Sequence, residues 1–286
     1  MQLDGRREST NVQDRRRGGG AVVGGLGIGG LLIAGLIYLL TGQAIDPSQL
    51  SEITGAGQTT AQTEFTEEEQ ALASFSKKIL AGTEDVWTAY FSAHNLGTYT
   101  PPTMVLYTGT TSSGCGTGSA AMGPFYCSAD QCLYIDLSFF SSMRQQLGAD
   151  GDFAYAYVIA HEVGHHVENQ LGVLGQAHQQ MAQMSKAKAN QMSVRIELFA
   201  DFLAGVWANN DNKAYRSLED GDIQEAIQCA QVIGDNYLQK KSQGYVVEES
   251  FTHGTSAQRM KWLKKGLTTG DISQGYPIFK MDYSAL

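Results

Sequence analysis

The stretch His161-Glu-Val-Gly-His165 decides how the rest of this chain is interpreted. It follows the run Phe153-Ala-Tyr-Ala-Tyr-Val-Ile-Ala160, which contains neither Gly nor Pro and is typical of a helix. Residues four apart in a helix lie on one face, about one turn from each other. The two imidazoles can therefore bind one metal ion, and the carboxylate of Glu162 can reach a metal-bound water from a neighbouring face. The pattern H-E-x-x-H on a helix thus predicts a Zn²⁺ site with two ligands, His161 and His165, and a general base.

A catalytic zinc also needs a third protein ligand. A third His six residues after the second is excluded, because Glu168 and Leu171 occupy the Gly and final His positions of the pattern H-E-x-x-H-x-x-G-x-x-H. The other arrangement uses a glutamate on a second helix, and the candidate is Glu197 in the run Arg195-Ile-Glu-Leu-Phe-Ala-Asp201. Asp201 lies four residues further, faces the same way, and can accept a hydrogen bond from a ligand histidine.

Apolar residues flank these two carboxylates, so both are expected to lie in the interior of the domain. A buried carboxylate without a partner is costly, and a metal ion and a histidine would satisfy Glu197 and Asp201. The competing interpretation is a solvated face on which a carboxylate pairs with Arg195. His178 is a rival third ligand in a polar stretch, whereas His166 points about 100° away from the neighbouring motif histidine and is not expected to bind metal.

The overall composition indicates one globular domain with appendages, or two domains. Charged residues make up 17% of the 286 residues, with 33 Gly and 5 Pro, which is neither a disordered composition nor that of a coiled coil. The formal net charge is −9. An acidic body argues against nucleic acid as a partner, since binding phosphates needs a basic surface.

The N-terminal part predicts a membrane anchor. Residues 1–20 are polar and hold five Arg, and we interpret them as a disordered cytoplasmic tail. Residues 21–40 carry no charge and, at about 30 Å as a helix, are long enough to cross a bilayer once. A signal peptide, a Gly-rich loop and a buried helix are the alternatives. The basic tail precedes the apolar run, so the N-terminus is expected to stay cytoplasmic and the body to lie outside, in the periplasm or the extracellular space.

Two further features belong to this prediction. Gly25 and Gly29 would give the transmembrane helix one face for close helix contact, which permits oligomers. Residues 41–64 are polar and are expected to be a linker, and residues 65–286 hold the globular domain.

The four cysteines, Cys115, Cys127, Cys132 and Cys229, form no C-x-x-C pair, which argues against a structural zinc knuckle. In an oxidising compartment a disulfide would stabilise the Gly/Ser-rich stretch around Cys115. Cys115 and Cys127 are one candidate pair, but four cysteines allow several pairings and the sequence does not choose between them. Buried free thiols are the alternative.

The local patterns around the metal helix predict helices and a few short strands. Thr66 and Glu69 have the spacing of a capping box, which opens a helix that ends near residue 94 and is interrupted near Gly82. Residues 103–107 and 131–136 are β-like runs. The second run precedes the metal helix and is a candidate edge strand for binding an extended peptide.

Taken together, these motifs resemble a known family. The pair His161-Glu-Val-Gly-His165 and Glu197-Leu-Phe-Ala-Asp201 is similar to the pattern of glutamate zincins, the thermolysin-like peptidases. More specifically, the chain resembles the bacterial family called putative neutral zinc metallopeptidases over most of its length. The further stretches that carry this resemblance are Ser113-Gly-Cys-Gly116, Met122-Gly-Pro-Phe-Tyr-Cys127 and Thr252-His-Gly-Thr-Ser-Ala-Gln-Arg259.

The resemblance implies a fold and roles for single residues. The implied fold is α+β and predominantly α, a zincin-like domain with a small sheet that binds Zn²⁺. In glutamate zincins a histidine from the C-terminal half commonly stabilises the oxyanion, and His253, in a turn before a helix, is the candidate. An ordinary turn histidine is the alternative. Arg259, about one turn into that helix, is expected to pair with an interior carboxylate such as Asp201.

The predicted function is that of a membrane-anchored zinc metallopeptidase acting on peptides or proteins. His161, His165 and Glu197 would bind Zn²⁺, and Glu162 would take a proton from the attacking water and return it to the leaving amine. Asp201 would orient a ligand histidine. The alternative is a proteolytically inactive, membrane-anchored binding or chaperone-like protein that keeps the zincin fold.

Overall fold

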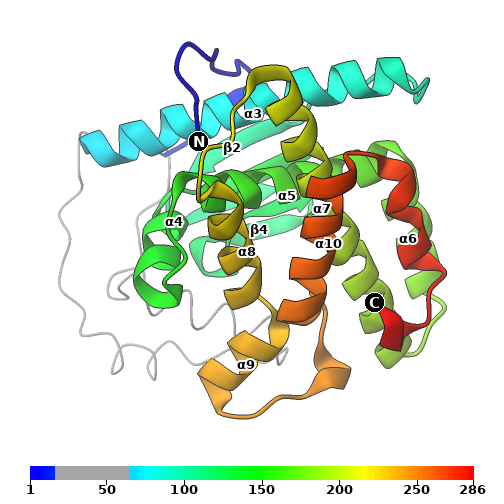
Figure 1. The fold of residues 1–286 in the computed structure, drawn as a ribbon. Helices are drawn as coiled ribbons and strands as arrows, with labels where there is room; N and C mark the ends of the chain where they lie inside the picture. Colours follow the sequence, from blue (N-terminus) through cyan, green and yellow to red (C-terminus); the bar gives the residue numbers. More distant parts are fainter. Residues whose placement is uncertain (17–64) are drawn as a thin grey trace.

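A four-stranded mixed sheet forms one part of this computed structural model, which describes residues 1–16 and 65–286 (Figure 1). The strand order is β1-β2-β6-β5. β1 and β2 are parallel, β2 and β6 are parallel, and β5 runs antiparallel to β6. The bounds of the strands are β1 (Val12–Asp14), β2 (Thr103–Tyr107), β5 (Phe125–Cys127) and β6 (Cys132–Asp136).

This strand order corrects one prediction. Residues 131–136 do not form an edge, because β6 lies between β2 and β5 and is buried along its whole length. The edge strand next to the metal helix is β5, which precedes β6 in the sequence. A separate hairpin of β3 (Thr110–Ser113) and β4 (Gly116–Ser119) precedes it.

Helices make up most of the described residues, so the predicted class, α+β and predominantly α with a small sheet, is confirmed. α3 (Glu67–Ala93) begins at the predicted capping box of Thr66 and Glu69, but it continues through Gly82 without a break. In Figure 1 it runs along one side of the molecule. The remaining helices are α4 (Ser138–Ser142), the π-helical turn η2 (Met143–Leu147), α5 (Asp152–Gln170), α6 (Val173–Met181), α7 (Lys186–Tyr215), α8 (Asp222–Val232), α9 (Asp235–Gln243) and α10 (Ser256–Thr269).

Helix α7 packs against both α5 and α10. One close backbone contact at each interface sets the distance between the two helices. A Cβ on Gly164 of α5 would lie 2.9 Å from the backbone oxygen of Ala200 in α7. A Cβ on Gly205 of α7 would lie 2.4 Å from the backbone oxygen of Leu263 in α10. Real side chains do not tolerate such distances, so both positions need glycine. The two glycines let the metal helix and α10 approach α7 closely.

The N-terminal residues differ from the prediction. Residues 1–16 were expected to be disordered, yet β1 pairs with β2 and the amino group of Met1 lies 2.7 Å from Asp152 Oδ2 at the start of α5. Arg6 forms an ion pair with Asp211 of α7 at 2.9 Å. The predicted disorder is therefore wrong for residues 1–16, because their basic and polar side chains find partners on the domain.

The predicted transmembrane helix, residues 21–40, and the linker, residues 41–64, lie outside the described residues. Within residues 1–16 and 65–286, no helix is both long and apolar enough to span a bilayer. The predicted orientation puts the N-terminal tail and the domain on opposite sides of a membrane. In this fold the Arg16 guanidinium lies 3.9 Å from the centre of the Phe65 ring.

A disulfide joins Cys115, in the turn of the β3–β4 hairpin, to Cys127 at the end of β5, with 5.8 Å between the Cα atoms. Cys132 and Cys229 are free and buried. The cross-link ties the hairpin to the edge strand of the sheet.

Candidate metal centre

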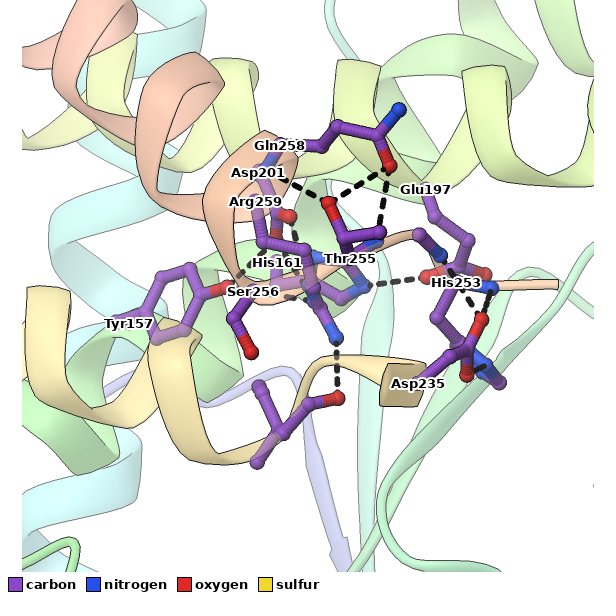
Figure 2. A network of polar contacts seen from close by, with 12 residues as sticks. Tyr157, His161, Glu197, Asp201, Asp235, His253, Thr255, Ser256, Gln258 and Arg259 are labelled. Carbon is purple, nitrogen blue, oxygen red and sulfur yellow. Dashed lines mark hydrogen bonds and ion pairs between the residues drawn. The ribbon is translucent and has the colours of Figure 1, made fainter. Parts of the chain in front are cut away.

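Two histidines of α5 and a glutamate of α7 point ligand atoms at one place. One such atom from each of His161, His165 and Glu197 lies within 4.8 Å of the other two. Glu197 Oε2 is 3.1 Å from His161 Nε2, and Glu197 Oε1 is 3.6 Å from His165 Nε2. Figure 2 shows Glu197 and His161 reaching toward this place from neighbouring helices. The structure therefore brings together the three predicted ligands.

The other nitrogen of each imidazole faces a carboxylate. His161 Nδ1 lies 2.8 Å from Asp201 Oδ1, and His165 Nδ1 lies 2.9 Å from Glu168 Oε2. A carboxylate accepts hydrogen bonds, so each Nδ1 can donate its proton to its carboxylate, which would leave the lone pair of Nε2 for a metal ion. This is the arrangement in which carboxylates orient ligand histidines toward a metal.

These residues fit Zn²⁺. Two imidazole nitrogens and one carboxylate are a known donor set for a catalytic zinc, which keeps its fourth position open. The competing role of Arg195 is not seen, since its guanidinium donates to the backbone oxygen of Met281 at 2.8 Å. His178 is exposed on α6 and lies outside the group of three. His166 also lies outside the group, and its Nε2 is 2.7 Å from the Thr100 backbone oxygen.

A buried polar network supports Asp201. Arg259 of α10 donates from Nε and Nη2 to the two oxygens of Asp201, at 2.8 Å each, and the Tyr157 hydroxyl donates to Oδ1 at 2.6 Å (Figure 2). Burial alone would raise the pKa of Asp201, but the charges of Arg259 and His161 hold this pKa well below its usual range. Asp201 is therefore ionised and fixed, and the predicted contact with Arg259 is present.

The predicted base, Glu162, faces the same cavity as the ligands. The cavity has a volume of about 720 Å³ and is lined by Glu162, Glu197 and His253 together with apolar side chains. Burial raises the pKa of Glu162 above its usual value. The apolar part of the lining comes from the 3-10 turn η1 (Ala120–Met122), α4, η2 and the region of α8 and α9. It includes Met122, Phe139, Met143, Leu147, Ile233 and Leu238.

His253 is held at the edge of this cavity by Asp235. Asp235 Oδ2 accepts hydrogen bonds from the backbone N–H groups of Thr252, His253 and Gly254, and Oδ1 lies 3.2 Å from His253 Nδ1 (Figure 2). The His253 side chain is about one-third exposed. Burial would lower its pKa, but the carboxylates of Glu197 and Asp235 raise it to about 9. His253 is therefore a charged donor at neutral pH.

Three of these residues were not predicted from the sequence. Glu168 had a detectable signal, because it lies three residues after His165 and thus on the same helix face. Tyr157 likewise lies four residues before His161. Asp235 had no comparable signal, since it is eighteen residues from His253 and begins helix α9, whereas His253 lies in the loop before α10.

Comparison with known proteins agrees with this geometry. The family described as "Putative neutral zinc metallopeptidase" matches residues 1–276. The chain belongs to this family. The Uncharacterized protein YpfJ of Escherichia coli K12 is 46% identical over 281 residues, covering 96% of this chain and 97% of that protein. The Uncharacterized protein Rv2575 of Mycobacterium tuberculosis H37Rv is 44% identical over 183 residues, covering 60% of this chain and 61% of that protein. No solved structure matches the chain.

The family description names zinc and peptidase chemistry, which agrees with the predicted cofactor and class of enzyme. The names of these relatives state no activity.

Proposed function

We propose that this protein is a zinc-dependent metallopeptidase with a zincin-like active site. One observation carries the proposal: the Glu197 carboxylate faces Nε2 of both motif histidines, and Asp201 and Glu168 hold their Nδ1 atoms. A structural zinc would need only its ligands and the groups that hold them. This cavity also contains an acidic side chain that forms no hydrogen bond with a ligand histidine. Glu162 supplies it.

The roles of the residues follow from this arrangement. Zn²⁺ held by His161, His165 and Glu197 would polarise a carbonyl and acidify a water molecule. Glu162 takes the proton of the attacking water and gives it to the leaving amine, and its raised pKa suits a group that must do both. His253, held by Asp235, donates a hydrogen bond to the oxygen that becomes negative as the carbonyl is attacked. Asp201 and Arg259 keep the His161 ring in place.

The substrate that fits the cavity is an extended peptide with a large apolar side chain near the scissile bond. β5 is an edge strand, and Phe125 and Tyr126 of this strand line the cavity that holds the metal ligands. An edge strand can pair with an extended peptide through backbone hydrogen bonds. The apolar lining of the cavity provides space for one side chain of that peptide.

The proposed place of action is outside the cytoplasm. The Cys115–Cys127 disulfide favours an oxidising compartment, since such bonds are rare in the cytosol. Residues 21–40 remain the sequence-based candidate for contact with the membrane. The proposed substrates are therefore peptides or proteins near the outer face of the cell membrane.

The test uses the full chain in detergent, because a fragment without residues 1–16 would lack β1. Zinc content and cleavage of a mixed peptide library are measured for the wild type and for Glu162→Gln. We expect about one zinc per chain in both proteins, with cleavage reduced by at least about 100-fold in the variant. Glu248→Gln, an exposed substitution of the same kind, is the control and should cleave like the wild type. Zinc without cleavage in every protein would favour the inactive binding protein instead.

A further inference from the structure

Residues 1–16 occupy a surface made by β2, α3 and α7, and the backbone of this segment completes the sheet. Val12, Gln13 and Asp14 pair in parallel with Met104, Val105 and Leu106. The Met104 amide donates to the Asn11 carbonyl at 2.9 Å, and the Arg15 amide donates to the Leu106 carbonyl at 2.7 Å. The segment thus covers the edge of β2 that is opposite β6.

Two buried carboxylates of the domain have positive partners in this segment. Asp211 of α7, with a side chain that is 1% exposed, pairs with Arg6 at 2.9 Å. Glu84 of α3, 7% exposed, pairs with Arg7 at 2.8 Å, and its other oxygen accepts from the Ser9 hydroxyl at 2.5 Å. Removing one partner of a buried ion pair leaves an uncompensated charge, which destabilises the fold. Residues 1–16 are therefore part of the folded domain.

Similar contacts involve the other basic residues of this segment, from which the membrane orientation was predicted. Besides Arg6 and Arg7, Arg15 donates to the Ser112 carbonyl at 3.2 Å. Arg16 pairs with Asp14 at 2.5 Å and donates to the Glu69 carbonyl at 3.2 Å. These arginines bind the domain itself. Positive charge retained at the cytoplasmic surface is the usual reason for an N-terminus to stay inside, but charges bound in this way cannot remain there while the domain lies outside.

The two ends of the undescribed stretch 17–64 also meet. The guanidinium of Arg16 lies 3.9 Å from the centre of the Phe65 ring, at the beginning of α3. A single helical crossing of a hydrocarbon core about 30 Å thick would separate its two flanking residues by at least that distance. The contact between Arg16 and Phe65 therefore favours a position of both residues at the same face of a bilayer.

We propose that residues 1–16 are docked on the β2 edge in the mature protein and lie on the same side of the membrane as residues 65–286. The partner of this surface is thus the N-terminal segment of the chain itself, recognised by Glu84 and Asp211. This inference does not depend on the proposed peptidase activity.

The test compares the accessibility of two single cysteines in the full chain in bacterial cells. Thr10→Cys reports on the docked segment, and Lys264→Cys reports on the exposed side of α10. Each variant is treated with a membrane-impermeant maleimide in spheroplasts and again after lysis. The wild type corrects for the two free cysteines, which are buried. Asp4→Cys, a second exposed position, replaces Thr10→Cys if that variant does not accumulate.

The expected result is that both cysteines respond alike, both labelled before lysis or both only after it. Labelling of Thr10→Cys and Lys264→Cys on opposite sides would overturn the proposal. Hydrogen exchange of the purified full chain checks the docking separately: the amide of Arg15, which donates to Leu106, should exchange at least about tenfold more slowly than in an unfolded chain. Exchange at the unfolded rate would equally contradict the proposal.

Discussion

Arg259 of α10 binds both carboxylate oxygens of Asp201 in α7, from Nε and from Nη2, at 2.8 Å each. The oxygen that accepts from Nη2 also lies 2.8 Å from His161 Nδ1. Both side chains are almost fully buried, at 5% and 0% exposure. A planar guanidinium matches two carboxylate oxygens at once, which fixes the orientation of the carboxylate and, through it, of the imidazole.

Replacing Arg259 should destabilise the domain and weaken zinc binding together. Arg259→Ala leaves a buried charge on Asp201, so the free energy of unfolding should fall by about 3–5 kcal/mol. Urea unfolding followed by circular dichroism measures this change. Lys264→Ala, an exposed substitution in the same helix, should stay within about 0.5 kcal/mol of the wild type. A loss under about 1 kcal/mol for Arg259→Ala would show that the network does not stabilise the fold.

Glu168 should determine zinc affinity without binding the metal. Its Oε2 holds His165 Nδ1 at 2.9 Å, and its side chain is fully buried. Glu168→Gln keeps the size but removes the charge, so zinc affinity should fall by about 10–100-fold. Competition with a chromophoric chelator measures the affinity. Glu248→Gln is the matched exposed control. Equal zinc affinities of the two variants would show that Glu168 does not determine zinc affinity.

The metal helix and its ligands were predictable because their signals are local. Residues four apart on a helix share a face, so the pairing of His161 with His165 and of Glu197 with Asp201 follows from spacing alone. The apolar neighbours of Glu197 and Asp201 also predicted that both carboxylates are buried; in the structure Asp201 is fully buried and Glu197 is partly buried, at 17% exposure. That these two helices face one another does not follow from spacing, and it depends on the close contact at Gly164.

Gly164 should therefore be needed for the approach of α5 and α7. A Cβ at this position would lie 2.9 Å from the Ala200 backbone oxygen and would push the helices apart. Gly164→Ala should lower both thermal stability and zinc affinity, the latter by about tenfold or more. Gly175→Ala is the matched control, because a Cβ there meets nothing within 4 Å in helix α6. The control should be neutral or more stable by up to about 1 kcal/mol, and similar behaviour of the two variants would contradict this explanation.

The carboxylate of Asp235 should set the alkaline limit of activity. It contributes to raising the pKa of His253 to about 9, and the protonated donor is lost as the pH rises through that value. Asp235→Asn removes the charge, so the pKa should fall and the alkaline limb of kcat/KM should move to lower pH by about one unit or more. Asp220→Asn, an exposed aspartate, is the control. An unmoved limb in a folded, zinc-containing variant would exclude His253 as the charged donor.

Long-range contacts explain what the sequence did not predict. β1 is only three residues long and mostly polar, so it has no hydrophobic pattern to indicate a strand, and its pairing with β2 joins residues about ninety apart. The Asp235–His253 contact and the position of β5 at the sheet edge are likewise set by the folded arrangement. The arginines of residues 1–16 predicted a free basic tail, because the sequence does not show that they pair with the buried carboxylates of Glu84 and Asp211.

The most direct test of the central claim is the position of zinc itself. Diffraction data collected on either side of the zinc absorption edge, from crystals of the full chain, locate the ion by anomalous scattering. We expect one strong peak at about 2.0–2.2 Å from His161 Nε2, His165 Nε2 and a Glu197 oxygen. A peak at the acidic group of Asp152, Asp222 and Glu225 instead, or no zinc in crystals grown with added zinc, would contradict the account.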